Sequence, residues 1–110
     1  MEQTIMINVG KQFGRYPAGR YLSDGPYSGQ KFREEYLLPA LRANDEILEV
    51  ELDDARGLAS SFLEEAFGGL VREGFSPQVL INRLRFYTKD LSLVDEIHQY
   101  IRAQGQVDER

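Results

Sequence analysis

The chain contains no cysteine, and its only histidine is His98. The absence of cysteine excludes a disulfide framework, a thiolate metal site and a cysteine nucleophile, and it is consistent with a reducing compartment. One histidine is too few for a histidine-based metal site. The serines are not accompanied by the G-x-S-x-G turn of serine hydrolases, which argues against that class of enzyme.

Long hydrophobic runs are also missing. No segment approaches the roughly 20 apolar residues that a membrane span needs. The N-terminal segment 1–10 lacks both the basic residues and the apolar run of a signal peptide. We therefore expect a soluble, cytoplasmic domain without a membrane partner.

The chain has fewer basic than acidic residues: 13 Lys and Arg and 18 Asp and Glu, which give a net charge of −5. Such a chain is not suited to general nucleic-acid binding, which depends on neutralising phosphates. The distribution is uneven: residues 1–33 hold five basic and two acidic residues, and residues 34–110 hold eight basic and sixteen acidic. This asymmetry suggests a basic N-terminal loop that faces the acidic remainder of the chain or an anionic partner, with scattered surface charge as the simpler alternative.

Three β-strands are expected from apolar and β-branched runs at residues 4–9, 46–52 and 84–88. The middle run alternates apolar and acidic residues, which is typical of a strand with one solvated face. Between the first strand and the first helix, residues 10–29 hold five glycines and two prolines. A loop of this length is often functional. A short strand near residues 20–22 would interrupt it.

Four helices are expected from amphipathic spacing. They span about 30–43 after the cap Ser28, 60–72, 77–82 after the cap Ser76, and a last segment from Asp90 or Ser92 to the terminator Gly105. Pro39 should kink the first of them or end it early. The alternation predicts an α/β (α+β) fold, with a mixed β-sheet and helices packed on it in a single small domain over residues 1–105, followed by a frayed tail at 106–110.

The strongest local feature is the passage from the middle strand into the helix that begins at Ser60 and Ser61. The segment Ser61-Phe62-Leu63-Glu64 matches the S-x-x-E capping box. A helix start presents unpaired backbone N–H groups and positive dipole potential, which stabilise an anion. A serine there is a candidate for phosphorylation or phosphate binding, and an ordinary helix cap is the alternative.

Two glycines, Gly68-Gly69, follow in the middle of this helix. Each costs roughly 1 kcal/mol of helix stability relative to alanine. The pair is explained if another backbone approaches closely there, either that of the sheet or that of a docked partner.

The run from Val50 to Phe67 resembles the central element of STAS domains, the fold of the anti-sigma factor antagonists. Ser60 aligns with the serine that a partner kinase phosphorylates in those antagonists, and Ser61 aligns with the hydroxyl residue after it. Two positions depart from that pattern, because Ala59 replaces an acidic residue and Phe62 replaces a glycine.

A narrower group, the STAS-like domains of unknown function, is similar over residues 5–102. The shared motifs are Gly19-Arg20-Tyr21, Ser23-Asp24-Gly25, Ser28-Gly29, Phe32-Arg33-Glu34, Ser60-Ser61-Phe62 and Phe67-Gly68. This likeness implies a STAS-like fold more strongly than any one function.

The resemblance to the antagonists implies a non-enzymatic regulatory protein-interaction module, with phosphorylation of Ser60 or Ser61 as its switch. The implied partner is an ATP-binding regulator of the histidine-kinase ATPase type, and no cofactor is expected. The helix face that would dock this partner carries Phe62, Leu63, Gly68 and Gly69.

A second hypothesis is a small-anion or nucleotide-sensing domain built on the loop 10–29. Glycines permit close approach to an anion, and arginine side chains grip phosphate or carboxylate. In this hypothesis two arginines of the loop close over the Ser60 helix start. The candidate contact residues are Arg15, Arg20, Ser23 and Ser28. The simpler alternative is a structural loop whose arginines pair with Asp53, Asp54 or Glu34.

A third hypothesis is a metal-assisted phosphohydrolase. Asp53, Asp54 and Asp90 lie near strand ends, and carboxylates are suitable ligands for Mg²⁺. Acidic turn residues and helix caps explain the same residues without a metal. His98 is expected to be a surface residue near the end of the last helix.

Overall fold

The structure is a computed structural model that describes residues 4–107, with side chains described for residues 4–104. Its centre is a sheet of three strands: β1 (Ile5–Asn8), β2 (Leu48–Glu51) and β3 (Leu84–Tyr87). The strands lie in the order β1-β2-β3, and both pairings are parallel. In this register Ile5, Leu48 and Leu84 form one row across the sheet.

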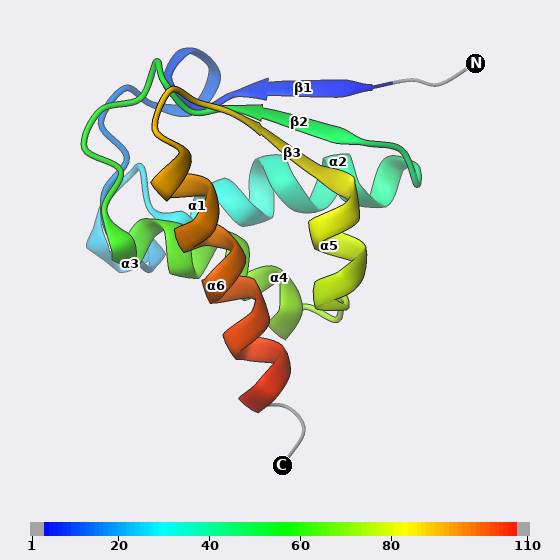
Figure 1. Ribbon diagram of the computed structural model, residues 1–110. Helices are drawn as coiled ribbons and strands as arrows, with labels where there is room; N and C mark the ends of the chain where they lie inside the picture. The colour runs from blue at the N-terminus through cyan, green and yellow to red at the C-terminus, as the bar shows by residue number, and fades with distance from the viewer. Residues whose placement is uncertain (1–3, 108–110) are drawn as a thin grey trace.

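Helical segments connect the strands, and one more helix follows the last strand (Figure 1). They are η1 (Val9–Phe13), η2 (Leu22–Asp24), α1 (Gly29–Phe32), η3 (Arg33–Leu37), α2 (Leu38–Ala43), α3 (Ser60–Leu63), η4 (Glu64–Gly68), α4 (Gly69–Arg72), α5 (Pro77–Arg83) and α6 (Leu91–Val107). α1, η3 and α2 follow one another without a break, and so do α3, η4 and α4. We refer to residues 29–43 as the first helical stretch and to residues 60–72 as the second.

The predicted α/β class is confirmed, and so is the predicted order of strands and helices. The sheet differs in one respect from the mixed sheet that the sequence suggests, because all of its described pairings are parallel. The reason lies in the connections. Each one passes through helices and brings the chain back to the end of the sheet where the previous strand began, so that neighbouring strands run parallel.

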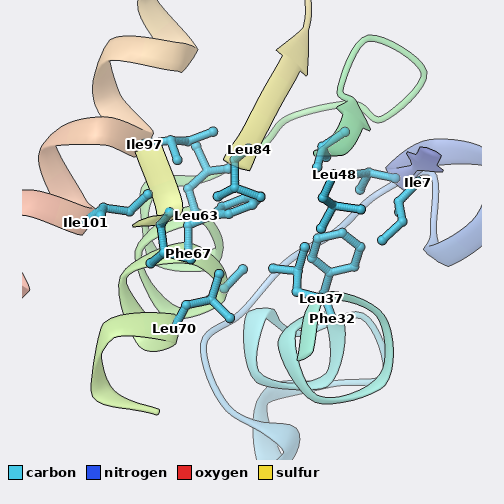
Figure 2. Packing of buried hydrophobic residues seen from close by; sticks show 14 of the residues in the cluster. Ile7, Phe32, Leu37, Leu48, Leu63, Phe67, Leu70, Leu84, Ile97 and Ile101 are labelled. Carbon is cyan, nitrogen blue, oxygen red and sulfur yellow. The ribbon is translucent and has the colours of Figure 1, made fainter. Parts of the chain in front are cut away.

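The hydrophobic core lies between the sheet and the helices, and helices α1 to α6 are on the same side of the sheet (Figure 1). Figure 2 shows side chains from all three strands meeting those of the two helical stretches and α6. Phe32, Phe67, Leu63 and Ile101 are among the core residues with no exposed surface. On the other side of the sheet Met6 is 48% exposed, as expected for period-2 alternation.

Three local predictions are wrong. Pro39 does not end the first helical stretch, which continues to Ala43. The π-helical segment η3 comes directly before it, and the Leu38 N–H donates to the carbonyl of Arg33, five residues back, so the wider turn accommodates the ring. No strand forms near residues 20–22, because Tyr21 leads into the 3₁₀ turn η2.

The third difference is at Gly105, which was expected to end the last helix. α6 passes through this glycine and ends at Val107, since one glycine costs a helix only about 1 kcal/mol. The predicted frayed tail is therefore helical at residues 106–107, and residues 108–110 lie outside the described residues. Within the described part of the chain, no helix combines the length and the apolar character needed to cross a bilayer.

Phe67→Ala tests the packing of the core. The Phe67 ring contacts the rings of Phe32 and Phe86, with centroids 6.3 and 5.3 Å apart. We expect urea denaturation to give a free energy of unfolding lower by about 3–5 kcal/mol, because a large cavity is left. Leu91→Ala, at a side chain that is 72% exposed, should change it by less than about 0.5 kcal/mol. Equal effects of the two substitutions would contradict this packing.

Candidate functional site

Ser60 is an exposed residue at the first position of the second helical stretch. Ala59 occupies the N-cap position with extended backbone, φ −74° and ψ 152°. The capping box predicted at Ser61 is therefore wrong, because the N-cap is Ala59 and the helix begins two residues earlier than that motif requires. Ser61 is half-buried in the first turn.

The start of this helix has no side-chain cap, since alanine has no acceptor. The first intrahelical bond runs from the Leu63 N–H to the Ala59 carbonyl at 3.1 Å. The amides of Ser60, Ser61 and Phe62 precede that bond, so they are the unpaired donors that a helix start presents. The exposed Ser60 hydroxyl thus lies at the positive end of the helix dipole.

Ser60 also lies beside α6. The Tyr100 hydroxyl donates a hydrogen bond of 2.5 Å to Glu96 Oε2. This bond raises the pKa of Tyr100 above its ordinary value, and the neighbouring Ser60 hydroxyl opposes the rise. A charge added at Ser60 would therefore be close to the carboxylate of Glu96.

The helix face expected to dock a partner is part of the core instead. Phe62 and Leu63 are 1% and 0% exposed, and Gly68 and Gly69 are buried. The docking role expected of these four residues is wrong, because none of them offers a surface to a partner while the domain is folded. The hydrophobic stripe packs inward, as such stripes do in most amphipathic helices.

The two glycines do mark a close approach, as expected, but it is internal. A Cβ atom on Gly68 would lie 3.4 Å from the Tyr100 carbonyl oxygen of α6. A Cβ atom on Gly69 would collide with the guanidinium of Arg33. The pair therefore makes room for α6 and for a buried arginine from the first helical stretch.

Arg33 and Glu65 form a buried ion pair between the two helical stretches. They are 7% and 5% exposed. Arg33 Nη1 donates to Glu65 Oε2 at 2.8 Å and to the Glu65 carbonyl at 2.5 Å. Arg33 Nε lies 3.4 Å from Glu73 Oε2 but has no hydrogen bond within the described structure. The pair joins residues 32 positions apart in the sequence.

Glu64 and Glu65 also bind two arginines nearer the surface. Arg72 Nη1 donates to Glu64 Oε2 at 2.9 Å and Arg72 Nη2 to Glu65 Oε1 at 3.2 Å. Arg20, from the loop 10–29, donates to Glu64 Oε1. Burial alone would raise the pKa of Glu64, but the hydrogen bonds from Arg72 and Arg20 outweigh it and hold that pKa below its ordinary value.

Sequence reasoning missed this ion network, whose members are Arg20, Arg33, Glu64, Glu65, Arg72 and Glu73. A signal was present, because Arg33 is four residues before the core residue Leu37, and Glu65 is three residues after the core residue Phe62. Both charges thus fall on the buried faces of their helices.

Ser28 and Asp24 have structural roles in the loop. Ser28 is 0% exposed and accepts from the Lys31 N–H at 3.2 Å, so its predicted capping role is confirmed and its anion contact is wrong. Asp24 Oδ2 accepts the N–H groups of Tyr21 and Arg20 at 2.8 and 3.0 Å, and these two bonds lower its pKa. Ser23 is exposed within η2.

The loop borders the Ser60 helix start on two sides. Before Ser60, the Arg56 N–H donates to the Arg15 carbonyl at 2.7 Å. After it, Arg20 reaches Glu64. The segments before α1 and before α3 accordingly run side by side in Figure 1. Arg20 is committed to carboxylates, so it does not close over the helix start as the anion-sensor hypothesis requires.

Exposed aromatic side chains gather on this loop. Among the described residues, four of the eight exposed large hydrophobic side chains belong to residues 14–27. They are Tyr16, Tyr21, Leu22 and Tyr27, with exposed fractions of 69%, 52%, 51% and 45%. We call this set the loop tyrosine surface. Tyrosine is enriched in protein interfaces.

The three aspartates near strand ends serve separate structural roles. Asp53 accepts from the Thr88 hydroxyl and the Lys89 N–H at 2.7 and 2.8 Å. Asp54 accepts from Asn8, and Asp90 accepts from the Ser92 N–H at the start of α6. Within residues 4–104, no group of three His, Cys, Asp or Glu side chains is arranged to hold a metal ion.

His98 is less exposed than the sequence analysis expected. His98 is half-buried, with its ring 6.2 Å from that of Phe86. Burial lowers its pKa, and Arg102 adds to the effect. It is a packing residue of α6 and not a fully exposed one.

The chain matches a known family model. The family model described as "STAS-like domain of unknown function (DUF4325)" matches residues 28–90. The matched region begins at the cap of α1 and ends after β3, so it contains both helical stretches and the Arg33–Glu65 pair. No curated protein and no solved structure matches the chain.

Glu65→Ala tests the buried ion pair. The substitution leaves Arg33 buried without its main charge partner, and we expect the free energy of unfolding to fall by about 3–5 kcal/mol in urea denaturation. Combining it with Arg33→Met should recover a large part of that loss, because no buried charge is then left. A double variant no more stable than Glu65→Ala would show that the buried charge is not the cause.

Glu64→Gln tests the pH dependence. The pKa of Glu64 is lowered in the folded state, so its contribution to stability is complete above the unfolded pKa of about 4.3 and is lost as the pH falls through the lower folded pKa. We expect the variant to be less stable than the parent chain at pH 7 and to lose less stability on acidification in thermal melts. Glu35→Gln, at an exposed glutamate, should keep the parent profile.

Proposed function

Because the chain belongs to the family of STAS-like domains of unknown function, we propose that it is a regulatory protein-binding module. Its partner contact is controlled by phosphorylation of Ser60, and it catalyses no reaction. The resemblance of residues 50–67 to the anti-sigma factor antagonists supports this assignment.

The exposure of Ser60 is the observation that carries the proposal. The residue is exposed, and the amides of the first helical turn precede the first intrahelical bond. A kinase needs an accessible hydroxyl, and a helix start stabilises a phosphate group once it is attached. Ser61 is half-buried, so it is the weaker candidate of the two.

Phosphorylation would change the charge of this corner of the domain strongly. It adds about −1.5 to −2 charges at pH 7. Glu64 is one helical turn away from Ser60, and Glu96 is held beside it by Tyr100. A phosphate among these carboxylates creates a concentrated negative potential, and it repels a partner that binds the unmodified surface.

The loop tyrosine surface is the contact area that we assign to the partner. It adjoins the helix start through the Arg56–Arg15 hydrogen bond and the Arg20–Glu64 ion pair. Exposed tyrosines provide large contact area with little loss of side-chain entropy. We assign the partner contact to the loop tyrosine surface in place of the buried residues Phe62 and Leu63. By resemblance, the partner is a histidine-kinase-type ATPase regulator.

Substitution of Ser60 tests the switch. Ser60→Ala and Ser60→Asp variants serve as bait in cells that produce the protein, and co-purified ATPase regulators are quantified by mass spectrometry. We expect the alanine variant to retain the partner and the aspartate variant to lose at least about tenfold in binding, equivalent to 1.4 kcal/mol. Ser61→Asp is the matched control and should bind more strongly than Ser60→Asp.

Mass spectrometry of the purified parent chain and variants also tests whether Ser60 is phosphorylated. Fragment masses from the parent chain should place a phosphate on residue 60, and the Ser60→Ala variant should carry none. Equal partner binding by the alanine and aspartate variants, or a phosphate found only at another residue, would contradict the proposal.

A further inference from the structure

A separate hollow of about 320 Å³ opens where β1 and β2 end. It is lined by Gly10, Lys11, Arg15 and Asp54. Gly10 comes two residues after the end of β1, and Asp54 comes three residues after the end of β2. The hollow therefore lies outside the carboxyl ends of these two parallel strands.

Hydrogen bonds fix the walls of this hollow. Asn8 Nδ2 donates to Asp54 Oδ2 at 2.7 Å, and Asn8 Oδ1 accepts from the Lys11 N–H at 3.0 Å. The backbone of Gly10 packs so closely on that of Asp54 that a Cβ atom would collide with it. The Arg15 carbonyl accepts from the Arg56 N–H. The hollow is thus a built feature of the fold.

The charge of the hollow favours an anion. Lys11 Nζ lies 3.8 Å from Asp54 Oδ2. Within the described part of the chain, Arg15 makes no ion pair, whereas Arg20 and Arg33 from the same basic segment are both paired with glutamates. Two cations and one carboxylate therefore line the space, which gives this lining a net charge of +1.

We propose that this hollow binds a small phosphate ester that carries hydroxyl groups. Arg15 and Lys11 bind the phosphate, because a guanidinium and an ammonium both donate to its oxygens. Asp54 accepts a hydrogen bond from a hydroxyl of the same molecule. The volume is at the small end of the range of about 300–1,000 Å³ for ligand pockets, which fits a sugar phosphate better than a dinucleotide.

This site is distinct from the anion site that the sequence suggested. That hypothesis placed Arg15 and Arg20 over the Ser60 helix start, but Arg20 is bound to Glu64. The hollow uses Lys11 in its place and lies at the strand ends. The inference does not depend on the proposed regulatory function.

Isothermal titration calorimetry with ribose 5-phosphate, inorganic phosphate and ribose, at one ionic strength, tests the proposal. We expect ribose 5-phosphate to bind with a dissociation constant of about 1 mM or below, and at least tenfold more tightly than inorganic phosphate or ribose. Arg15→Gln should weaken its binding at least tenfold. Arg42→Gln, at another exposed arginine, should leave it unchanged.

Asp54→Asn tests the hydroxyl-binding part of the site separately from the phosphate-binding part. It should reduce binding of ribose 5-phosphate toward the level of inorganic phosphate, while binding of inorganic phosphate is kept or improved. Circular dichroism and thermal melts establish that each variant is folded. The proposal is overturned if the parent chain binds none of the probes saturably, if Arg15→Gln binds ribose 5-phosphate as the parent does, or if inorganic phosphate binds as tightly as the ester.

Discussion

The buried ion pair of Arg33 and Glu65 is the interaction on which the arrangement of the helices depends. It joins the first helical stretch to the second at a point where both are packed against the core. Gly69 lacks a side chain where the Arg33 guanidinium passes, and Gly29 approaches the Phe62 carbonyl. A buried charge without a partner is strongly destabilising. The two stretches therefore fit together in the one register that pairs these charges.

The ion network, together with Asp24, also holds the loop 10–29 in place. Glu64 and Glu65 bind Arg20, and Asp24 binds the amides that follow Gly19, so the glycine-rich loop is held beside the second helical stretch. Arg20 of this loop and Arg33 of the first helical stretch are thus paired with glutamates of the second helical stretch. For Arg20, this is one of the two arrangements that the charge asymmetry suggested. Ser60, the loop tyrosine surface and Arg15 are among the residues that stay exposed.

Much of the fold could be predicted from local patterns, because capping and periodicity act over a few residues. The caps Ser28, Ser76 and Asp90 and the three strands are examples. The docking surface could not be predicted in the same way. Phe62 and Leu63 belong to a stripe that suits a core or a partner equally well, and only the position of the sheet and α6 decides between them. Pro39 is similar, since a π-helical turn before it accommodates the ring.

By itself, the sequence determined the α/β alternation, the family motifs and the helix that begins at Ser60, because each of these depends on residues that are close neighbours in the chain. Only the tertiary structure decided that Arg33 meets Glu65, that Arg20 is bound by Glu64, and that Lys11, Arg15 and Asp54 surround one hollow. The physical reason is that a charge along a sequence has no partner until folding brings distant segments together. The partner it then acquires determines whether the charge stabilises the domain or remains available to a ligand.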